Sequence, residues 1–305
     1  MQNYGGQLSH DNGAFPYSYL ELSKPTGKYV YRWILRLISR LSATGFVRYS
    51  GNACTPGLSF PYINPEHGIE QFSNFDCGLL IVNTLGNEPH RQAVLVPGEP
   101  FMNLQIRPHW ESIQDYLNDM SSKYRVRNKK VLSVSESVER RFLSELPTAE
   151  WLPACAQLLG KTLKQKTLAI SPNLSEMLFN FQRVLKDRFK AWGYYHNNEL
   201  IGFITAIETP VGVYAMHLGI NESKAQDFSL YQRMLIDLIG WSIEGKKEFL
   251  CMGRTSTEIK STLGATPVEN SFLFYTKSRI LRSLLGVYAN RIHKTKPYQI
   301  RSPFK

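Results

Sequence analysis

The chain has 305 residues, of which 43% are hydrophobic and 20% are charged, with a formal net charge of +11. This composition is ordinary for a globular protein, and the length favours two domains. No stretch approaches the roughly 20 apolar residues of a membrane span, and the polar N-terminus lacks a secretory signal pattern, so we expect a cytoplasmic protein. Four scattered cysteines without a CxxC pair argue against a disulfide framework and a zinc site. We expect buried free thiols and no metal.

The positive charge is unevenly distributed along the chain. Acidic residues are absent between Glu21 and Glu66 and again after Glu269, whereas lysines and arginines are frequent in both stretches. Such asymmetry favours an anionic partner, which can be a membrane surface, a nucleic acid or a phosphorylated substrate. The two stretches hold basic amphipathic segments, 28–42 and 277–293. Each could lie on a membrane surface, or pack its apolar side on the protein with its charges in solvent.

Residues 1–130 are expected to form a smaller N-terminal half. The hydrophobic pattern predicts a helix over 28–42, strands over 78–85 and 91–98, of which the first is nearly all apolar and should be buried, and a second helix over 110–132. Cations gather in the C-terminal part of this second helix, where they suit the helix dipole. We expect the boundary between the two halves at its end.

The second domain is expected over 131–276, followed by a basic C-terminal helix and tail over 277–305. Its pattern predicts an α/β domain in which helices flank one mixed sheet. Strands 199–209 and 211–220 are expected to form an antiparallel hairpin. In chain order we expect a strand over 134–146, helices over 148–163 and 173–188, strands over 189–197, 199–209 and 211–220, a helix over 228–245, a strand over 248–253, a helix over 255–265 and a strand over 270–276.

This order of elements resembles the GNAT acyltransferase superfamily. A local set of residues between the long helix and the last strand is more specific, and it resembles the Fem-like branch, which includes peptidoglycan-bridge and BioF-associated acetyltransferase proteins. The set is Leu230–Tyr231, Gly245, Gly253–Arg254–Thr255–Ser256, Lys260 and Gly264–Ala265. The resemblance implies a GNAT fold with a mixed, mostly antiparallel sheet flanked by helices, preceded by a smaller GNAT-like N-terminal half.

The resemblance also implies a function. We expect an N-acyltransferase that moves an acyl group from a thioester donor, acyl-CoA or similar, to an amine on an anionic or lipid-linked acceptor, in the cytoplasm or at the inner membrane face. Many GNAT enzymes bind the coenzyme A pyrophosphate with a glycine-rich loop, but segment 221–230 contains no glycine. Transfer of an aminoacyl group from tRNA, as in the Fem proteins, therefore stays open as an alternative. So does a catalytically silent binding protein of the same fold.

Four residues are candidates for the chemistry. Lys260 stands four residues before Gly264, where the resemblance implies the group that protonates the leaving thiolate; the alternative is an exposed helix lysine. Arg254 could clamp a phosphate or carboxylate, or neutralise a helix end. His217 could be a base or a core histidine. Glu222 is a second candidate base.

The start of the long helix is expected to hold the donor, because its free N–H groups and dipole favour an anionic group. The candidate donor-binding residues there are Lys224, Phe228, Ser229 and Tyr231.

Overall fold

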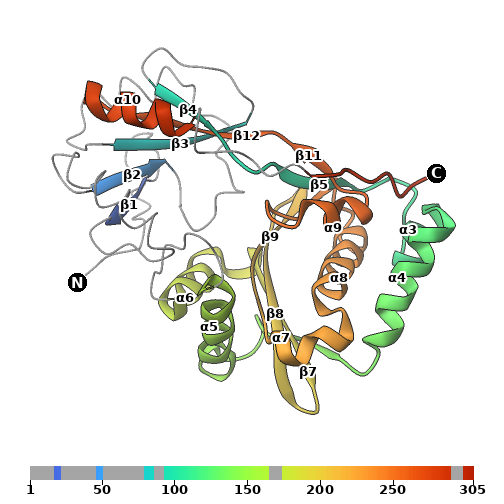
Figure 1. Ribbon diagram of the computed structural model, residues 1–305. Helices are drawn as coiled ribbons and strands as arrows, with labels where there is room; N and C mark the ends of the chain where they lie inside the picture. Colours follow the sequence, from blue (N-terminus) through green and yellow to red (C-terminus); the bar gives the residue numbers. More distant parts are fainter. Residues whose placement is uncertain (1–16, 22–45, 51–78, 86–92, 165–173, 290–297) are drawn as a thin grey trace. The chain divides into compact units, whose positions relative to one another are not determined.

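The computed structural model describes residues 17–21, 46–50, 79–85, 93–164, 174–289 and 298–305 (Figure 1). The chain divides into two compact units. The first unit comprises residues 1–100, 166–171 and 268–297, and the second comprises 101–165, 172–267 and 298–305. This division differs from the expected one after residue 130, because a strand and two helices before that point belong to the second unit.

A seven-stranded sheet forms the second unit, in the order β11-β5-β10-β9-β8-β7-β6. Neighbouring strands run antiparallel from β6 to β9 and between β5 and β10, whereas β9 and β10 run parallel. The mixed, mostly antiparallel sheet expected from the sequence is therefore confirmed. The strands are β5 (Phe101–Gln105), β6 (Glu139–Phe142), β7 (Phe189–His196), β8 (Glu199–Glu208), β9 (Gly212–Ile220), β10 (Phe249–Cys251) and β11 (Thr266–Val268).

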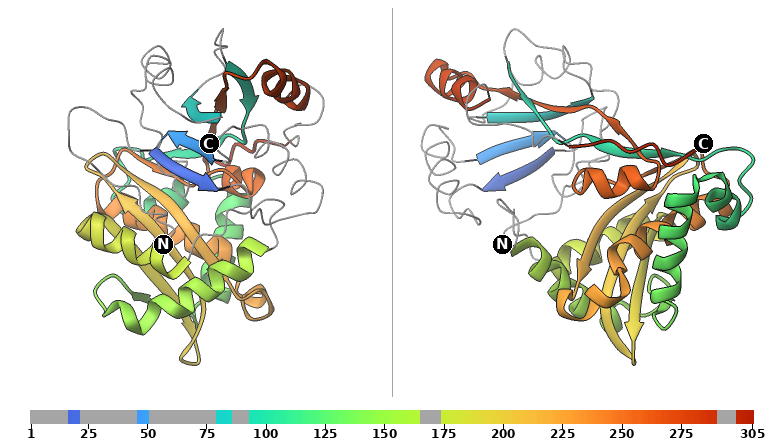
Figure 2. Two further views of the ribbon diagram at one scale, coloured as in Figure 1. Left: turned by 90° about the vertical axis from the view of Figure 1, so that its left-hand side faces the viewer. Right: turned by 45° about the vertical axis from the view of Figure 1, so that its right-hand side comes forward.

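Helices cover both faces of this sheet, as the views in Figures 1 and 2 agree in showing. Phe203 of β8 is buried with Trp151 of α5 on one face, and Ile204 is buried with Leu235 of α8 on the other. Because both faces are covered, β8 is apolar along almost its whole length. The helices of this unit are α3 (Ile113–Asp119), α4 (Ser122–Val134), α5 (Thr148–Lys164), α6 (Leu174–Leu185), α7 (Glu222–Ala225), α8 (Leu230–Glu244) and α9 (Thr257–Thr262), with single 3₁₀ turns at η1 (Lys186–Arg188) and η2 (Gln226–Phe228).

The hairpin and the long helix predicted from the sequence are both confirmed. Strands β8 and β9 pair antiparallel, and the N–H of Thr209 donates to the carbonyl oxygen of Gly212 at 2.8 Å across the turn. Helix α8 then leads from β9 to β10, and its C-terminal cap is Gly245. This link is what places β10 beside β9 in the parallel direction.

The first unit contains a five-stranded sheet in the order β1-β2-β3-β12-β4. Strand β12 pairs antiparallel with both β3 and β4, so the prediction that 270–276 closes the sheet of the second domain is wrong. Long-range pairing, which no local pattern encodes, decides which sheet a strand joins. The elements are β1 (Tyr17–Glu21), β2 (Phe46–Ser50), β3 (Leu79–Leu85), β4 (Ala93–Pro97), β12 (Asn270–Tyr275) and α10 (Arg279–Val287).

Two further elements differ from the expectation. The helix predicted over 110–132 is divided into α3 and α4, because Met120 adopts an extended conformation (φ −72°, ψ 148°) and forms a bridge with Phe304. The strand predicted over 134–146 is reduced to β6. The amphipathic segment 28–42 and residues 290–293 lie outside the described residues. None of the described helices is long and apolar enough to cross a membrane.

Candidate active site

Strands β9 and β10 separate partway along their length. Cys251 of β10 pairs with Tyr214 of β9, the last pair between the two strands, although β9 continues to Ile220. On its other side the chain after β10 stays with β5: the N–H of Met252 donates to the carbonyl oxygen of Met102 at 2.8 Å. We call this divergence beyond the Cys251–Tyr214 pair the β9–β10 fork. It leaves a length of β9 without a strand on that side among the described residues.

Gly253 follows β10 at the fork. Its φ of +76° lies in the left-handed region, which glycine adopts without a steric cost. A β-carbon at this position would lie 3.8 Å from the carbonyl oxygen of Ala215 and 3.9 Å from Nζ of Lys260. The turn after β10 therefore lies close both to β9 just beyond its last pair and to the side chain of Lys260.

Lys260 is buried, with only 2% of its surface exposed. Its Nζ donates to the carbonyl oxygens of Gly253 at 3.1 Å and Arg254 at 3.3 Å. The alternative of an exposed helix lysine is therefore wrong. Two charge-assisted hydrogen bonds instead hold the ammonium group at the fork. The local sequence explains the placement, since α9 begins two residues after the Gly253–Arg254 turn and folds Lys260 back over it.

Arg254 and Tyr231 lie at the same turn. The guanidinium carbon of Arg254 is 5.9 Å from the ring centroid of Phe101, and Arg254 is half-buried. Tyr231, in the first turn of α8, forms a side-chain hydrogen bond with Ser256; burial raises the pKa of the phenol although this hydrogen bond lowers it. The structure thus brings Tyr231, Arg254 and Lys260 together around the turn formed by residues 253–256.

The other two candidate catalytic residues lie elsewhere. His217 is held in β9 through its backbone, which exchanges hydrogen bonds with the hydroxyl of Thr205, and its ring centroid is 5.6 Å from that of Phe181. Glu222 is exposed in the short helix α7. The contact between the His217 ring and Phe181 of α6 favours the interpretation of His217 as a core histidine.

Two of the candidate donor-binding residues hold the link before α8 in place. Lys224 forms an ion pair with Glu199, and the ring of Phe228 lies 4.7 Å from that of His196. Both partners flank the turn between β7 and β8. Ser229 has a φ of +49° and begins α8 without a side-chain capping hydrogen bond. Of the four residues predicted for donor binding, Tyr231 is thus the one that contacts the turn at the fork.

Glu208, at the end of β8, is bonded to neighbouring side chains. Its carboxylate lies 2.8 Å from Nζ of Lys247 and accepts a hydrogen bond from Nε1 of Trp241 at 3.1 Å. Partial burial would raise the pKa of Glu208, but the hydrogen bonds from Lys247 and Trp241 outweigh it and hold the pKa below its usual value. A carboxylate held in this way stays ionised and bonded, which makes it a poor base.

The C-terminal residues 298–305 support α9 and were missed by sequence reasoning. The N–H of Gln299 donates to Oε1 of Glu258 at 3.2 Å, and the N–H of Arg301 donates to Oγ of Ser261 at 3.1 Å. Phe304 packs on Trp110, with ring centroids 5.4 Å apart. These contacts join residues 40 or more positions apart in the chain, and no local pattern signals them. They connect the helix that carries Lys260 to the region around α3.

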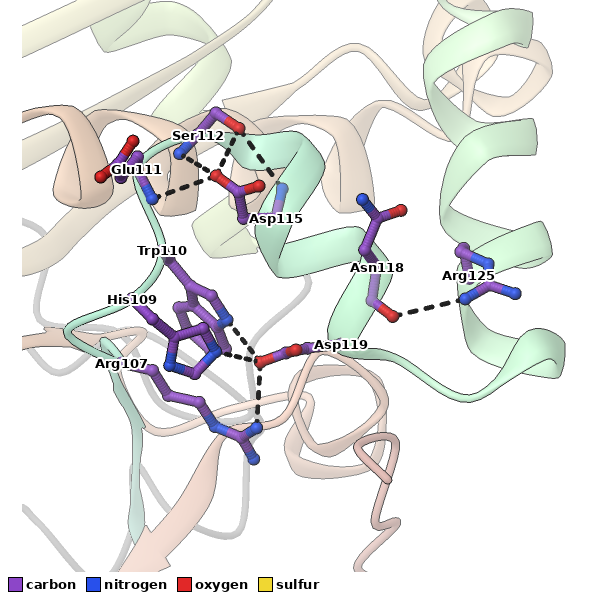
Figure 3. Close-up of polar contacts among 9 residues, drawn as sticks. All are labelled: Arg107, His109, Trp110, Glu111, Ser112, Asp115, Asn118, Asp119 and Arg125. Carbon is purple, nitrogen blue, oxygen red and sulfur yellow. Dashed lines mark hydrogen bonds and ion pairs between the residues drawn. The ribbon is translucent and has the colours of Figure 1, made fainter.

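A polar cluster joins the segment before α3 to Asp119, the last residue of that helix (Figure 3). Asp119 accepts hydrogen bonds from Nε1 of Trp110 at 2.7 Å and from Nη1 of Arg107 at 3.0 Å, and its carboxylate lies 2.8 Å from Nε2 of His109. The hydrogen bonds from Trp110 and His109, with a smaller contribution from Arg107, hold the pKa of Asp119 below its usual value. The backbone of Asp119 also accepts from the N–H of Lys305. The cluster therefore fixes the segment on which residues 298–305 rest.

Among the described residues, no group of three or more histidine, cysteine, aspartate or glutamate side chains could hold a metal ion.

Comparison with known proteins gives matches in structure but none in sequence. No family model matches the chain, and no curated protein matches it. L-PGS from Bacillus licheniformis has 13% identity and a TM-score of 0.50, over 81% of this chain and 83% of that one. FemX has 9% identity and a TM-score of 0.52, over 79% of this chain and 83% of that one. Together with the sheet order, these similarities show that the chain shares the fold of L-PGS and FemX, in agreement with the fold that the sequence resemblance implied.

Proposed function

We propose that the protein is a GNAT-type N-acyltransferase that transfers an acyl group from a thioester donor to an amine on an anionic or lipid-linked acceptor. Lys260 carries this proposal. A lysine ammonium with 2% exposure is rare unless it is bonded, and this one is bonded at the point where two parallel strands diverge. A fixed positive charge there is what a reaction with an anionic intermediate requires.

Two residues at the turn, Lys260 and Tyr231, have a role in this chemistry. The acceptor amine attacks the acyl carbonyl carbon, a C–N bond forms, and the carbonyl oxygen becomes an oxyanion. The C–S bond then breaks, the thiolate leaves with a proton, and the amine loses one. The charge of Lys260 stabilises the oxyanion. The phenol of Tyr231 is protonated at neutral pH, so it can give its proton to the leaving thiolate, and the proton that the amine loses then restores the phenol.

The backbone of β9 beyond Tyr214 suits a donor with an extended, amide-bearing arm. Such an arm can take the place beside β9 that β10 leaves at the fork. Acyl-CoA has an arm of this kind. The link 221–229 nevertheless lacks a glycine, and Lys224 is paired with Glu199. Another carrier of an acyl thioester therefore fits the same site.

The exposed face of α4 favours one alternative, an aminoacyl-tRNA donor. Lys123, Arg127, Lys129 and Lys130 are all exposed on this helix, and segment 120–135 contains no acidic residue. A row of cations on one helix suits a phosphate backbone. Under this alternative the bond that breaks is the ester of the aminoacyl-tRNA, and the roles at the fork are unchanged.

Native mass spectrometry of the freshly purified protein separates the candidates. Co-purified acyl-CoA, or transfer of a labelled acyl group from acyl-CoA to an amine, supports the main proposal. A tRNA complex, together with transfer from labelled aminoacyl-tRNA, moves the donor to the alternative. Absence of transfer from both donors, across a panel of amines that includes aminolipids, favours a catalytically silent protein of this fold.

If the acceptor is lipid-linked, the protein works in the cytoplasm at the inner face of the membrane. The acid-free, basic stretch after Glu269 supports this peripheral location.

A further inference from the structure

Helix α10 has an apolar stripe that the described residues of the first unit leave exposed. Ile280, Leu284 and Val287 follow one another at helical spacing, and they are 68%, 45% and 45% exposed. A different face of the same helix buries Leu281 and Leu285. The helix therefore has an apolar face that packs on the described part of its unit and a second apolar face that does not.

This stripe differs from the other exposed apolar residues. Elsewhere in the described helices, large exposed apolar side chains occur at most in pairs: Val126 and Val134 in α4, and Phe179 and Val184 in α6. Within the described parts of the chain, α10 alone has three on one face. A single exposed apolar residue is normal, whereas a contiguous stripe marks an interaction surface.

The charges around the stripe indicate the partner. Lys277 and Arg279 are exposed at the start of α10, and the chain contains no acidic residue after Glu269. Arg282 is fixed by a hydrogen bond from Nη2 to the carbonyl oxygen of Thr276 at 2.8 Å, so it tethers the helix to the end of β12. A second copy of this helix would bring like charges together. An apolar stripe next to exposed cations instead suits the surface of an anionic lipid bilayer.

We propose that α10 docks on anionic lipid bilayers by burying Ile280, Leu284 and Val287 among the acyl chains, with Lys277 and Arg279 at the phosphate groups. Helix α10 is then the surface through which the protein contacts the membrane. This docking is independent of the proposed chemistry, because vesicle binding is measured without donor or acceptor.

The test is sedimentation of the full-length protein with vesicles of mixed phosphatidylglycerol and phosphatidylcholine, and with vesicles of phosphatidylcholine alone. The wild type should bind the anionic vesicles, and the binding should fall with added salt. The double variant Ile280→Ser/Leu284→Ser should lose about tenfold or more in partition coefficient, because two apolar side chains no longer enter the bilayer. Its unfolding should match the wild type, since both side chains are exposed.

The matched control is Val126→Ser/Phe179→Ser, which removes two apolar side chains of 62% and 44% exposure from the second unit. This control should bind vesicles as the wild type does. Arg279→Gln should weaken binding about fivefold, and Arg127→Gln on α4 should have much less effect.

Three results would overturn the proposal. The first is equal binding to both vesicle types or to neither. The second is an Ile280→Ser/Leu284→Ser variant that binds vesicles like the wild type. If that variant changes only from a dimer to a monomer, the stripe is an interface between two copies of the chain. The third is an Arg127→Gln effect as large as that of Arg279→Gln, which would place the contact on α4.

Discussion

The ring of Phe304 lies over the Cα of Gly264, where a β-carbon would approach Cε2 of that ring to 2.1 Å. Gly264 also has a φ of +90°, a conformation that side chains other than glycine rarely adopt. It ends the segment that carries Lys260, because the N–H of Gly264 donates to the carbonyl oxygen of Ser261. Two features therefore require glycine at this position: the positive φ, and the close approach of the Phe304 ring.

Gly264→Ala should lower the free energy of unfolding by about 2–4 kcal/mol. Backbone strain at a positive φ contributes about 1–3 kcal/mol, and the overlap with the Phe304 ring contributes a similar amount. Chemical unfolding of the variant measures the loss. Adding Phe304→Ala should remove the steric part alone, so the effects of the two substitutions should be strongly non-additive.

Gly240→Ala in α8 is the matched control for this substitution. Its new β-carbon would meet nothing closer than Cβ of Ile113 at 4.0 Å, and the residue is helical. It should therefore stabilise the protein by about 0.5–1 kcal/mol. Equal stability of the Gly264→Ala and Gly240→Ala variants would contradict the placement of Phe304.

Asp119 should make the stability of the protein sensitive to acid. Its pKa is lower in the folded state than the ordinary 3.8, because Trp110 and His109 donate hydrogen bonds to the carboxylate. The folded state then binds fewer protons than the unfolded state, so this stabilisation is present above about pH 4 and is lost as the pH falls through the folded pKa. The melting temperature should fall more steeply below about pH 4 in the wild type than in Asp119→Asn. Asp227→Asn, at an exposed position in η2, should keep the wild-type slope.

The two described cysteines should be unreactive in the folded protein. Cys155 and Cys251 are both free and buried. Burial raises the pKa of Cys155 to about 12, and it also raises that of Cys251. Roughly one Cys155 thiol in ten thousand is then ionised near pH 8, and the thiolate is the reactive form. After Cys54 and Cys77 are replaced by serine, a disulfide reagent should label neither thiol until guanidinium unfolds the chain; rapid labelling of the native protein would refute the burial.

Sequence reasoning could find the second unit's core elements because each has a strong local pattern. The strands β8 and β9 and the helix α8 are long, β8 is apolar along almost its whole length, and the turn residues 209–212 and Gly245 mark where the elements end. The sequence pattern could not show that β5 joins the sheet of the second unit and β12 the sheet of the first. β5 and β12 are short, and each joins a sheet whose other strands lie far away in the chain.

The site was predicted in part for the same reason. The turn after β10 and Lys260 belong to one local motif, so their proximity follows from a short stretch of sequence. The burial of Lys260 does not, because it depends on how the strands and helices around the fork pack. His217 lies in β9 and Glu222 in the exposed helix α7, both outside this local motif, so no short stretch of sequence fixes where they lie relative to it.

Lys260→Met should remove most of the acyl transfer rate. If the ammonium group acts on the oxyanion alone, kcat and kcat/KM should fall together by about 10²–10³, with KM little changed. Lys260→Arg should restore only part of the rate, since the larger guanidinium cannot make the same two contacts in the same space. The Met variant should also lose about 1–3 kcal/mol of unfolding free energy, because the carbonyl oxygens of Gly253 and Arg254 lose their donor. Rates must therefore be measured on the folded fraction.

Lys247→Met separates the catalytic loss from the structural one. Lys247 is also a poorly exposed lysine, and its Nζ donates to the carbonyl oxygen of Thr209 at 3.0 Å and pairs with Glu208 at 2.8 Å. It lies at the end of β9 that is paired with β10, away from the fork. Its loss should cost similar stability and leave kcat intact. If the two variants lose stability equally and also lose activity equally, Lys260 has a structural role alone. A Lys260→Met variant that raises KM with unchanged kcat would make Lys260 a residue that binds substrate and does not act on the transition state.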